Sequence, residues 1–84
     1  MIKIENILFS DTKIIIYTKK GNGFFDISNS ERLKYADKSQ IEDYTITPFG
    51  LHWDKLDEDL CFDGFNFDFD KNDNIRYIFP FEKK

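Results

Sequence analysis

The stretch KIIIYTKKGNGFFDI, from Lys13 to Ile27, decides the fold. Its β-branched and aromatic residues are typical of strands, so residues 13–20 and 24–27 are predicted to pair as a hairpin. Gly21-Asn22-Gly23 tolerates the positive φ of a tight reversal and is predicted to form the turn. Residues 2–9 set apolar side chains between polar ones and precede a polar turn, which predicts a three-stranded antiparallel meander.

A short helix is predicted to follow the meander. Glu31 lies three residues after Ser28, which is the spacing of a capping box that opens a helix. Residues 43–47 and 51–53 are predicted as strands because apolar and polar residues alternate in them. The proline and glycine of residues 48–50 favour a reversal between these strands, so the pair is predicted to form a β-hairpin.

The C-terminal segment has the clearest alternation in the chain. Phenylalanines alternate with polar residues over 65–70, a period of two that puts the rings on one face of a strand. After a polar turn at 71–74 the pattern repeats over 75–81, which predicts an additional aromatic β-hairpin over residues 65–82. Residues 1–84 are thus predicted to form one α+β domain: a meander, a short helix, a β-hairpin and this C-terminal hairpin.

The composition favours a small domain in a reducing compartment. The chain of 84 residues has ten phenylalanines for a dense core and a single cysteine, which excludes an internal disulfide. The N-terminal residues alternate between charged and apolar side chains, so they are not expected to form a signal peptide. The longest apolar run, Ile14–Tyr17, is far shorter than the roughly 20 residues that cross a bilayer. A cytoplasmic location without membrane contact is therefore expected.

Charge is distributed unevenly along the chain. The net charge is −4, and residues 41–84 hold eleven acidic but only five basic side chains. Such a surface repels a phosphate backbone, so direct binding to nucleic acid is not expected. A basic or mixed-charge protein partner would instead be attracted to it, whereas a merely solvated acidic face is the simpler interpretation.

The most unusual segment places the only histidine and the only tryptophan at a strand end, ahead of an acidic turn over residues 54–59. Neighbouring strand residues point to opposite faces, so one of the two rings is expected in the core and the other at the surface. A carboxylate such as Asp57 is expected to hold the histidine protonated. The candidate partner-binding residues are His52, Trp53, Asp54, Asp57, Glu58 and Asp59.

No motif for catalysis, for a cofactor or for a metal occurs in the sequence. Adjacent acids in a polar turn usually point in different directions, which argues against a metal or acid–base role for them. Cys61 has no basic neighbour in the sequence, and it is expected to be a small buried residue rather than a nucleophile. We therefore expect no enzymatic activity and no cofactor.

Three segments carry a resemblance to a known family. The patterns GLHW at 50–53, LDEDL at 56–60 and GF at 64–65 resemble the GIHW, LDEDI and GLL patterns of the domain-of-unknown-function family 2442. The resemblance covers about residues 5–65. Asp54 departs from it, since family members usually have proline there.

This resemblance implies a small bacterial α+β protein in which a meander leads into a short helix and a hairpin. It also implies an antitoxin-like role beside a small protein partner, since such a role has been proposed for family members.

The leading hypothesis is a non-catalytic, cytoplasmic protein-binding module that uses the acidic turn as its contact patch. One alternative is a small metal- or carboxylate-dependent hydrolase, in which Asp57 and Asp59 would position a metal or water beside His52. Another is a structural role, in which the C-terminal hairpin makes a homodimer across a two-fold axis.

Overall fold

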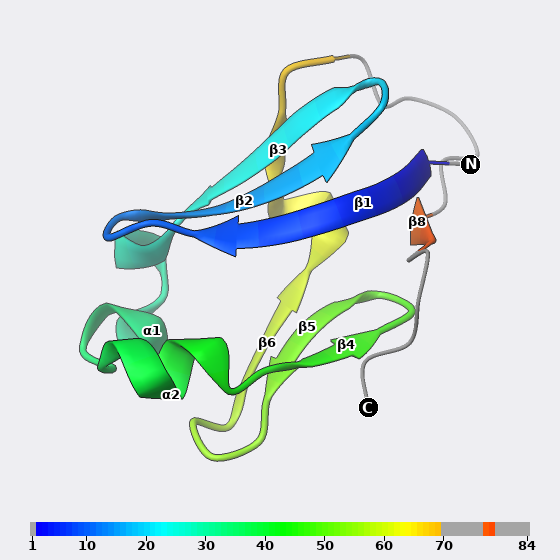
Figure 1. Ribbon diagram of the computed structural model, residues 1–84. Coiled ribbons are helices and arrows are strands. Elements are labelled where there is room, and N and C mark those ends of the chain that lie inside the picture. Colours follow the sequence, from blue (N-terminus) through cyan, green and yellow to red (C-terminus); the bar gives the residue numbers. More distant parts are fainter. Residues whose placement is uncertain (1, 70–76, 79–84) are drawn as a thin grey trace.

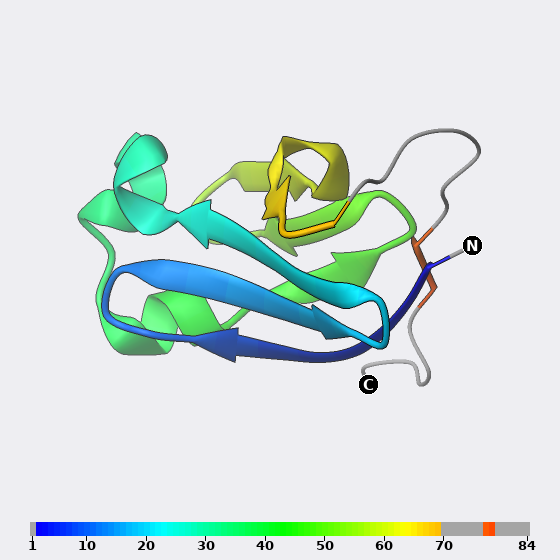
Figure 2. The same cartoon turned by 90° about the horizontal axis from the view of Figure 1, so that it is seen from above.

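The computed structural model describes residues 2–69 and 77–78, which form two β-sheets and two short α-helices. The sheets lie one above the other, with both helices at one end (Figures 1 and 2). The α+β class is therefore confirmed. Short 3-10 helices, η1 and η2, lie between some of the elements. The elements are β1 (Ile2–Phe9), β2 (Lys13–Thr18), β3 (Gly21–Asp26), η1 (Ile27–Asn29), α1 (Glu31–Lys34), α2 (Lys38–Glu42), β4 (Thr45–Thr47), β5 (Gly50–Trp53), β6 (Glu58–Cys61), η2 (Phe62–Gly64), β7 (Asn66–Phe67) and β8 (Tyr77–Ile78).

The larger sheet has the strand order β7-β3-β2-β1-β8, and its centre is the predicted antiparallel meander. The position of the turn differs from the prediction. Thr18 faces Gly21 across the hairpin, so Lys19 and Lys20 make the turn and the glycines belong to β3. The Thr18 hydroxyl accepts hydrogen bonds from the backbone of Lys20 and Gly21 and donates one to the Gly21 carbonyl.

The two glycines of β3 do not form the turn. They allow residues of the neighbouring C-terminal segment to pack closely against β3. Gly21 has a φ of +148°, which side-chain-bearing residues rarely adopt, and a Cβ there would collide with the Asp68 carboxylate. At Gly23 a Cβ would lie 2.6 Å from the Phe67 ring. A glycine in a turn and a glycine that makes room for a ring of the neighbouring strand look the same in the sequence.

The smaller sheet has the order β4-β5-β6, and the predicted hairpin of β4 and β5 is confirmed. A third strand, β6, was not predicted. It pairs antiparallel with β5, and Trp53 faces Glu58. The predicted acidic turn is therefore shorter: it spans residues 54–57, while Glu58 and Asp59 lie on β6. Glu58 and Asp59 make this strand resemble part of the acidic turn in the sequence. Such charged residues are tolerated in the strand because only one of its faces packs on the core.

The helical region begins at a different cap from the predicted one. Ser30, rather than Ser28, is the N-cap of α1, and its hydroxyl accepts a hydrogen bond from the Leu33 amide. Asp26 caps the preceding η1 instead, with the Ser28 amide as donor. Ser30 is buried, so tertiary packing selects between the two serines of this segment.

The C-terminal strands pair differently from the predicted hairpin. β7 pairs antiparallel with β3, while β8 pairs parallel with β1 at the opposite edge of the sheet. A period of two indicates which side chains share a face, but it does not determine the neighbouring strand. The predicted turn at 71–74 and most of the predicted strand at 75–81 lie outside the described residues.

The core fills the space between the two sheets. Isoleucines of β1 and β2 meet Leu51 and Trp53 of β5, and Leu33 closes one end. Phe62 and Phe65, which lead the chain from β6 to β7, complete the cluster. Because the inward face of β5 supplies Leu51 and Trp53, its outward face presents His52 to solvent. Cys61 is exposed, contrary to the expected burial.

Candidate functional site

The structure places the six predicted contact residues in different environments. Trp53 lies in the core at 1% exposure, and its indole Nε1 donates a hydrogen bond to the Ile41 carbonyl at 2.7 Å. His52, on the opposite face of β5, retains a side chain that is 30% exposed. The prediction that one ring is core and the other surface is confirmed, and Trp53 is not available for contact with a partner.

His52 lies between two carboxylates. Its Nδ1 is 2.6 Å from Oδ1 of Asp59, and its Nε2 is 3.1 Å from Oδ1 of Asp54. Asp59 faces His52 directly across the β5–β6 pair, whereas Asp54 begins the turn that follows β5. We call these three residues the acidic face.

The surroundings of His52 favour its charged form. The hydrogen bonds that the ring donates to Asp54 and Asp59 raise the pKa of the imidazole, and partial desolvation of the ring opposes this rise. The expectation of a protonated histidine agrees with this geometry, but the expected partner was wrong, because Asp54 and Asp59 hold the ring rather than Asp57. Residues two apart on a strand share a face, and this brings Asp54 to His52.

Asp57 and Glu58 have different roles. Asp57 lies in the exposed turn with a φ of +52°, and its amide donates to the Asp54 carbonyl at 3.2 Å. The Glu58 carboxylate accepts a hydrogen bond from the Ser30 hydroxyl, which connects β6 to the cap of α1. Glu58 is therefore part of the scaffold. Of the two acids that the hydrolase alternative places beside His52, Asp59 contacts the ring.

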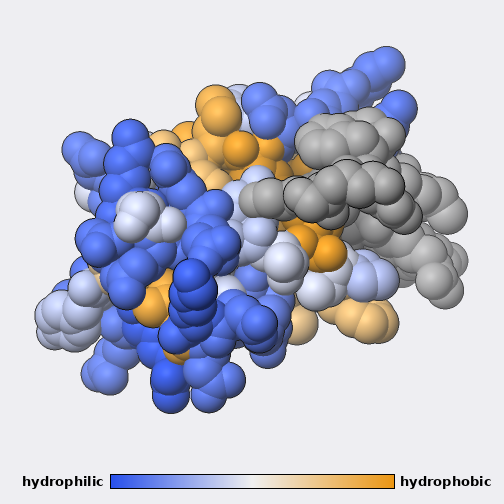
Figure 3. Space-filling model, turned by 60° about the horizontal axis from the view of Figure 1, so that its bottom comes forward, coloured by the Kyte–Doolittle hydropathy of each residue, from blue (hydrophilic) through white to orange (hydrophobic). Residues whose placement is uncertain are grey.

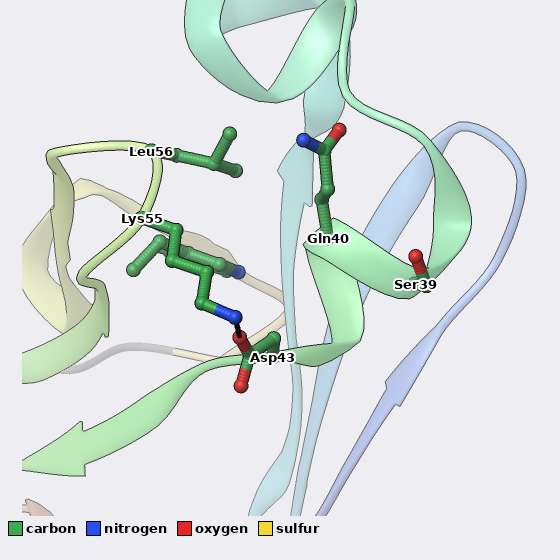
Figure 4. Close-up of a pocket in the computed structure, with 6 residues that line it drawn as sticks. Ser39, Gln40, Asp43, Lys55 and Leu56 are labelled. Carbon is green, nitrogen blue, oxygen red and sulfur yellow. Dashed lines mark ion pairs between the residues drawn. The ribbon is translucent and has the colours of Figure 1, made fainter.

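A groove lies on the other side of the same turn, between α2 and residues 55–56 (Figure 4). Its volume is about 280 Å³. Lys55 Nζ is 3.7 Å from Oδ2 of Asp43 in a solvent-exposed ion pair. The groove joins residues that are distant in sequence, so no local pattern could have predicted it. The lining residues are Ser39, Gln40, Asp43, Trp53, Lys55 and Leu56.

The end of the molecule that carries the helices and this turn is largely hydrophilic when viewed from below (Figure 3). The described residues include no group of three or more histidine, cysteine, aspartate or glutamate side chains arranged to hold a metal ion. In the same part of the chain, no helix has both the length and the apolar character that crossing a membrane demands.

The larger sheet presents a second exposed surface, which is apolar. Leu8, Ile15 and Phe24 face one another across β1, β2 and β3 on the side away from the core. Leu8 is 47% exposed, while Ile15 and Phe24 are half-buried. We call these three residues the apolar row. The sequence alone did not predict this row, because it depends on the register in which β1, β2 and β3 pair.

One family model matches the chain over residues 4–70, and its description is "Protein of unknown function (DUF2442)". The match includes both sheets as far as β7, together with the acidic face and the groove. No curated protein and no solved structure matches the chain.

Proposed function

This chain belongs to the DUF2442 family, and we propose that it is a non-catalytic module that binds a protein partner through the acidic face. The observation that supports the proposal is the arrangement of two exposed carboxylates around His52 on an open sheet surface. Asp54 and Asp59 are 93% and 75% exposed, so both acids remain accessible to a partner.

The partner has a basic contact surface. The acidic face has two carboxylates and one imidazolium, so it is net negative, and the chain as a whole has a net charge of −4. A positively charged protein surface is therefore attracted over distances of about a Debye length, or about 10 Å in moderate salt. More specifically, we propose that the chain is an antitoxin-like cytoplasmic protein that binds a small basic protein partner.

Recognition fits the acidic face better than hydrolysis. A carboxylate that acts on a substrate is usually held in a cavity that excludes water and changes its pKa. Asp54 and Asp59 instead extend into solvent, Asp54 from the turn after β5 and Asp59 from the outer side of the three-stranded sheet. The groove of about 280 Å³ is lined by Asp43 and Lys55 and not by the histidine.

The proposal is tested by quantitative affinity capture from the source cells. The protein is compared with the double variant Asp54→Asn, Asp59→Asn, which removes two charges and preserves the side-chain shapes. A matched control is Glu5→Gln with Asp11→Asn, which removes two charges from exposed positions in β1 and the turn after it. The proposal requires one stoichiometric basic protein that the wild type and the control retain and that the acidic-face variant loses. Equal retention by all three proteins, or no companion for any of them, would refute it.

A further inference from the structure

The two contacts of His52 require two protons on its ring. An ionised carboxylate has only acceptor atoms, whereas a neutral imidazole has one N–H donor and one bare nitrogen. Both ring nitrogens face a carboxylate oxygen, Nδ1 at 2.6 Å and Nε2 at 3.1 Å. Only the imidazolium can donate to both acids at once. When the proton leaves, one of the two contacts changes from a hydrogen bond into the repulsion of two lone pairs.

The contact that is lost is the one to Asp54. It is the longer of the two, and it reaches a carboxylate that is 93% exposed and attached to the turn. Asp59 is held by the strand pairing opposite His52, and its contact is shorter. A neutral ring therefore keeps its one N–H on Asp59 and turns a bare nitrogen toward Asp54.

The charged groups around the ring are few among the described residues. Asp54 faces it from the turn, and Asp59 faces it from β6. On the other side, β4 places the uncharged Thr45 opposite His52. The nearest lysine in sequence, Lys55, is paired with Asp43 at the groove. The titration of His52 is therefore governed by the two aspartates.

We propose that His52 is a proton-controlled latch, which in its charged form ties the turn after β5 to β6 and on losing its proton releases Asp54. The latch joins three points of the small sheet: the end of β5, the turn over residues 54–57, and Asp59 on β6. Its effect on a partner rests on the proposed function. The uncharged ring leaves the acidic face more negative and frees one carboxylate, so a basic partner binds more tightly as the pH rises.

The latch is tested by nuclear magnetic resonance on the full chain. Because the chain has a single histidine, its ring protons give a resolved titration. We expect a midpoint above the ordinary histidine value of about 6.5. The amide signals of residues 54–57 should shift with the same midpoint. Asp54→Asn and Asp59→Asn should each lower the midpoint, and the control Glu5→Gln should leave it unchanged. An ordinary midpoint, or amide signals that do not follow the ring, would overturn the latch.

A second measurement separates the latch from the proposed function. A hexa-arginine peptide serves as the basic probe, and its dissociation constant is measured below and above the midpoint. We expect about two- to fivefold tighter binding above the midpoint, the scale of one exposed ion pair, and no such change in His52→Gln. A raised midpoint that the amide signals of residues 54–57 follow, without any peptide binding, supports the latch and contradicts a basic partner. Peptide binding that is independent of pH in the wild type contradicts the latch and leaves the proposed function standing.

Discussion

Among the described residues other than glycine, Asp57 alone adopts a positive φ. Its φ of +52° lies in the left-handed region, where a side chain generally costs about 1 kcal/mol and where aspartate is tolerated better than most residues. This conformation closes the turn between Trp53 and Glu58 and so brings β6 back along β5. The backbone of one residue thus determines where Asp59 meets His52.

Replacing this aspartate tests the conformation directly. Asp57→Gly should raise the free energy of unfolding by up to about 1 kcal/mol, because glycine adopts this φ without strain. Asp57→Ala should lower it by about 1 kcal/mol, since alanine lacks the short polar side chain that makes the region accessible. Urea unfolding of the three proteins measures both changes. A more stable alanine variant would contradict the assigned backbone conformation.

His52 should make stability depend on pH in a defined direction. Its pKa is raised in the folded state by the hydrogen bonds that the ring donates to Asp54 and Asp59. Its stabilising contribution is therefore fully present below the unfolded pKa of about 6.5 and is lost as the pH rises through the higher folded value. The difference in unfolding free energy between the wild type and His52→Gln should be larger at about pH 5.5 than at about pH 8.5. Equal differences at both values would exclude an ion pair at His52.

At the scale of elements, the pairing of β5 with β6 depends on a glycine. A Cβ at Gly50 would collide with the backbone carbonyl oxygen of Leu60. Gly50→Ala should therefore force the strands apart and cost on the order of 2–3 kcal/mol. Gly64→Ala is the matched control, because nothing lies within 4 Å of a Cβ there, and its stability should change by less than about 1 kcal/mol. Thermal unfolding of the wild type and both variants measures the two changes in stability. Equal losses of stability in the two variants would contradict the close contact at Gly50.

A second connection between elements runs from α1 to β6. Ser30 caps the helix and also donates to the Glu58 carboxylate. Ser30→Ala should lower the unfolding free energy by about 1–2 kcal/mol, whereas Ser28→Ala, at the exposed serine, should change it by less than about 0.5 kcal/mol. A double-mutant cycle of Ser30→Ala with Glu58→Gln should show coupling of at least about 0.5 kcal/mol. Additive losses would show that the two residues act independently.

The elements also show what local sequence can predict. The isoleucines of β2 and the Pro48–Gly50 reversal carry strong local signals, and both correctly predicted their strands. β6 was missed because Glu58 and Asp59 resemble a turn, and their strand is stabilised by pairing with β5. The choice of Ser30 over Ser28 as the cap depends on the burial of Ser30 and on its hydrogen bond to Glu58. These misses have one cause: long-range contacts override local preference.

At the scale of the whole molecule, the two sheets bury their inner faces against each other and leave two different outer surfaces (Figure 1). The smaller sheet presents the acidic face and the larger sheet presents the apolar row. The sequence located the acidic face approximately, since His52, Asp54 and Asp59 are all among the six candidate residues, whereas the candidate Trp53 is buried. The partners of His52 could not be predicted, because they depend on which strand lies beside β5.

The most direct test of recognition through the acidic face is to map the contact surface by nuclear magnetic resonance, adding the captured partner to the isotopically labelled chain. We predict that the amide signals that shift most belong to β4, β5, β6 and the turn over residues 54–57, with the largest changes near His52, Asp54 and Asp59. Shifts concentrated on the apolar row of Leu8, Ile15 and Phe24 would contradict this account and would identify the larger sheet as the binding surface.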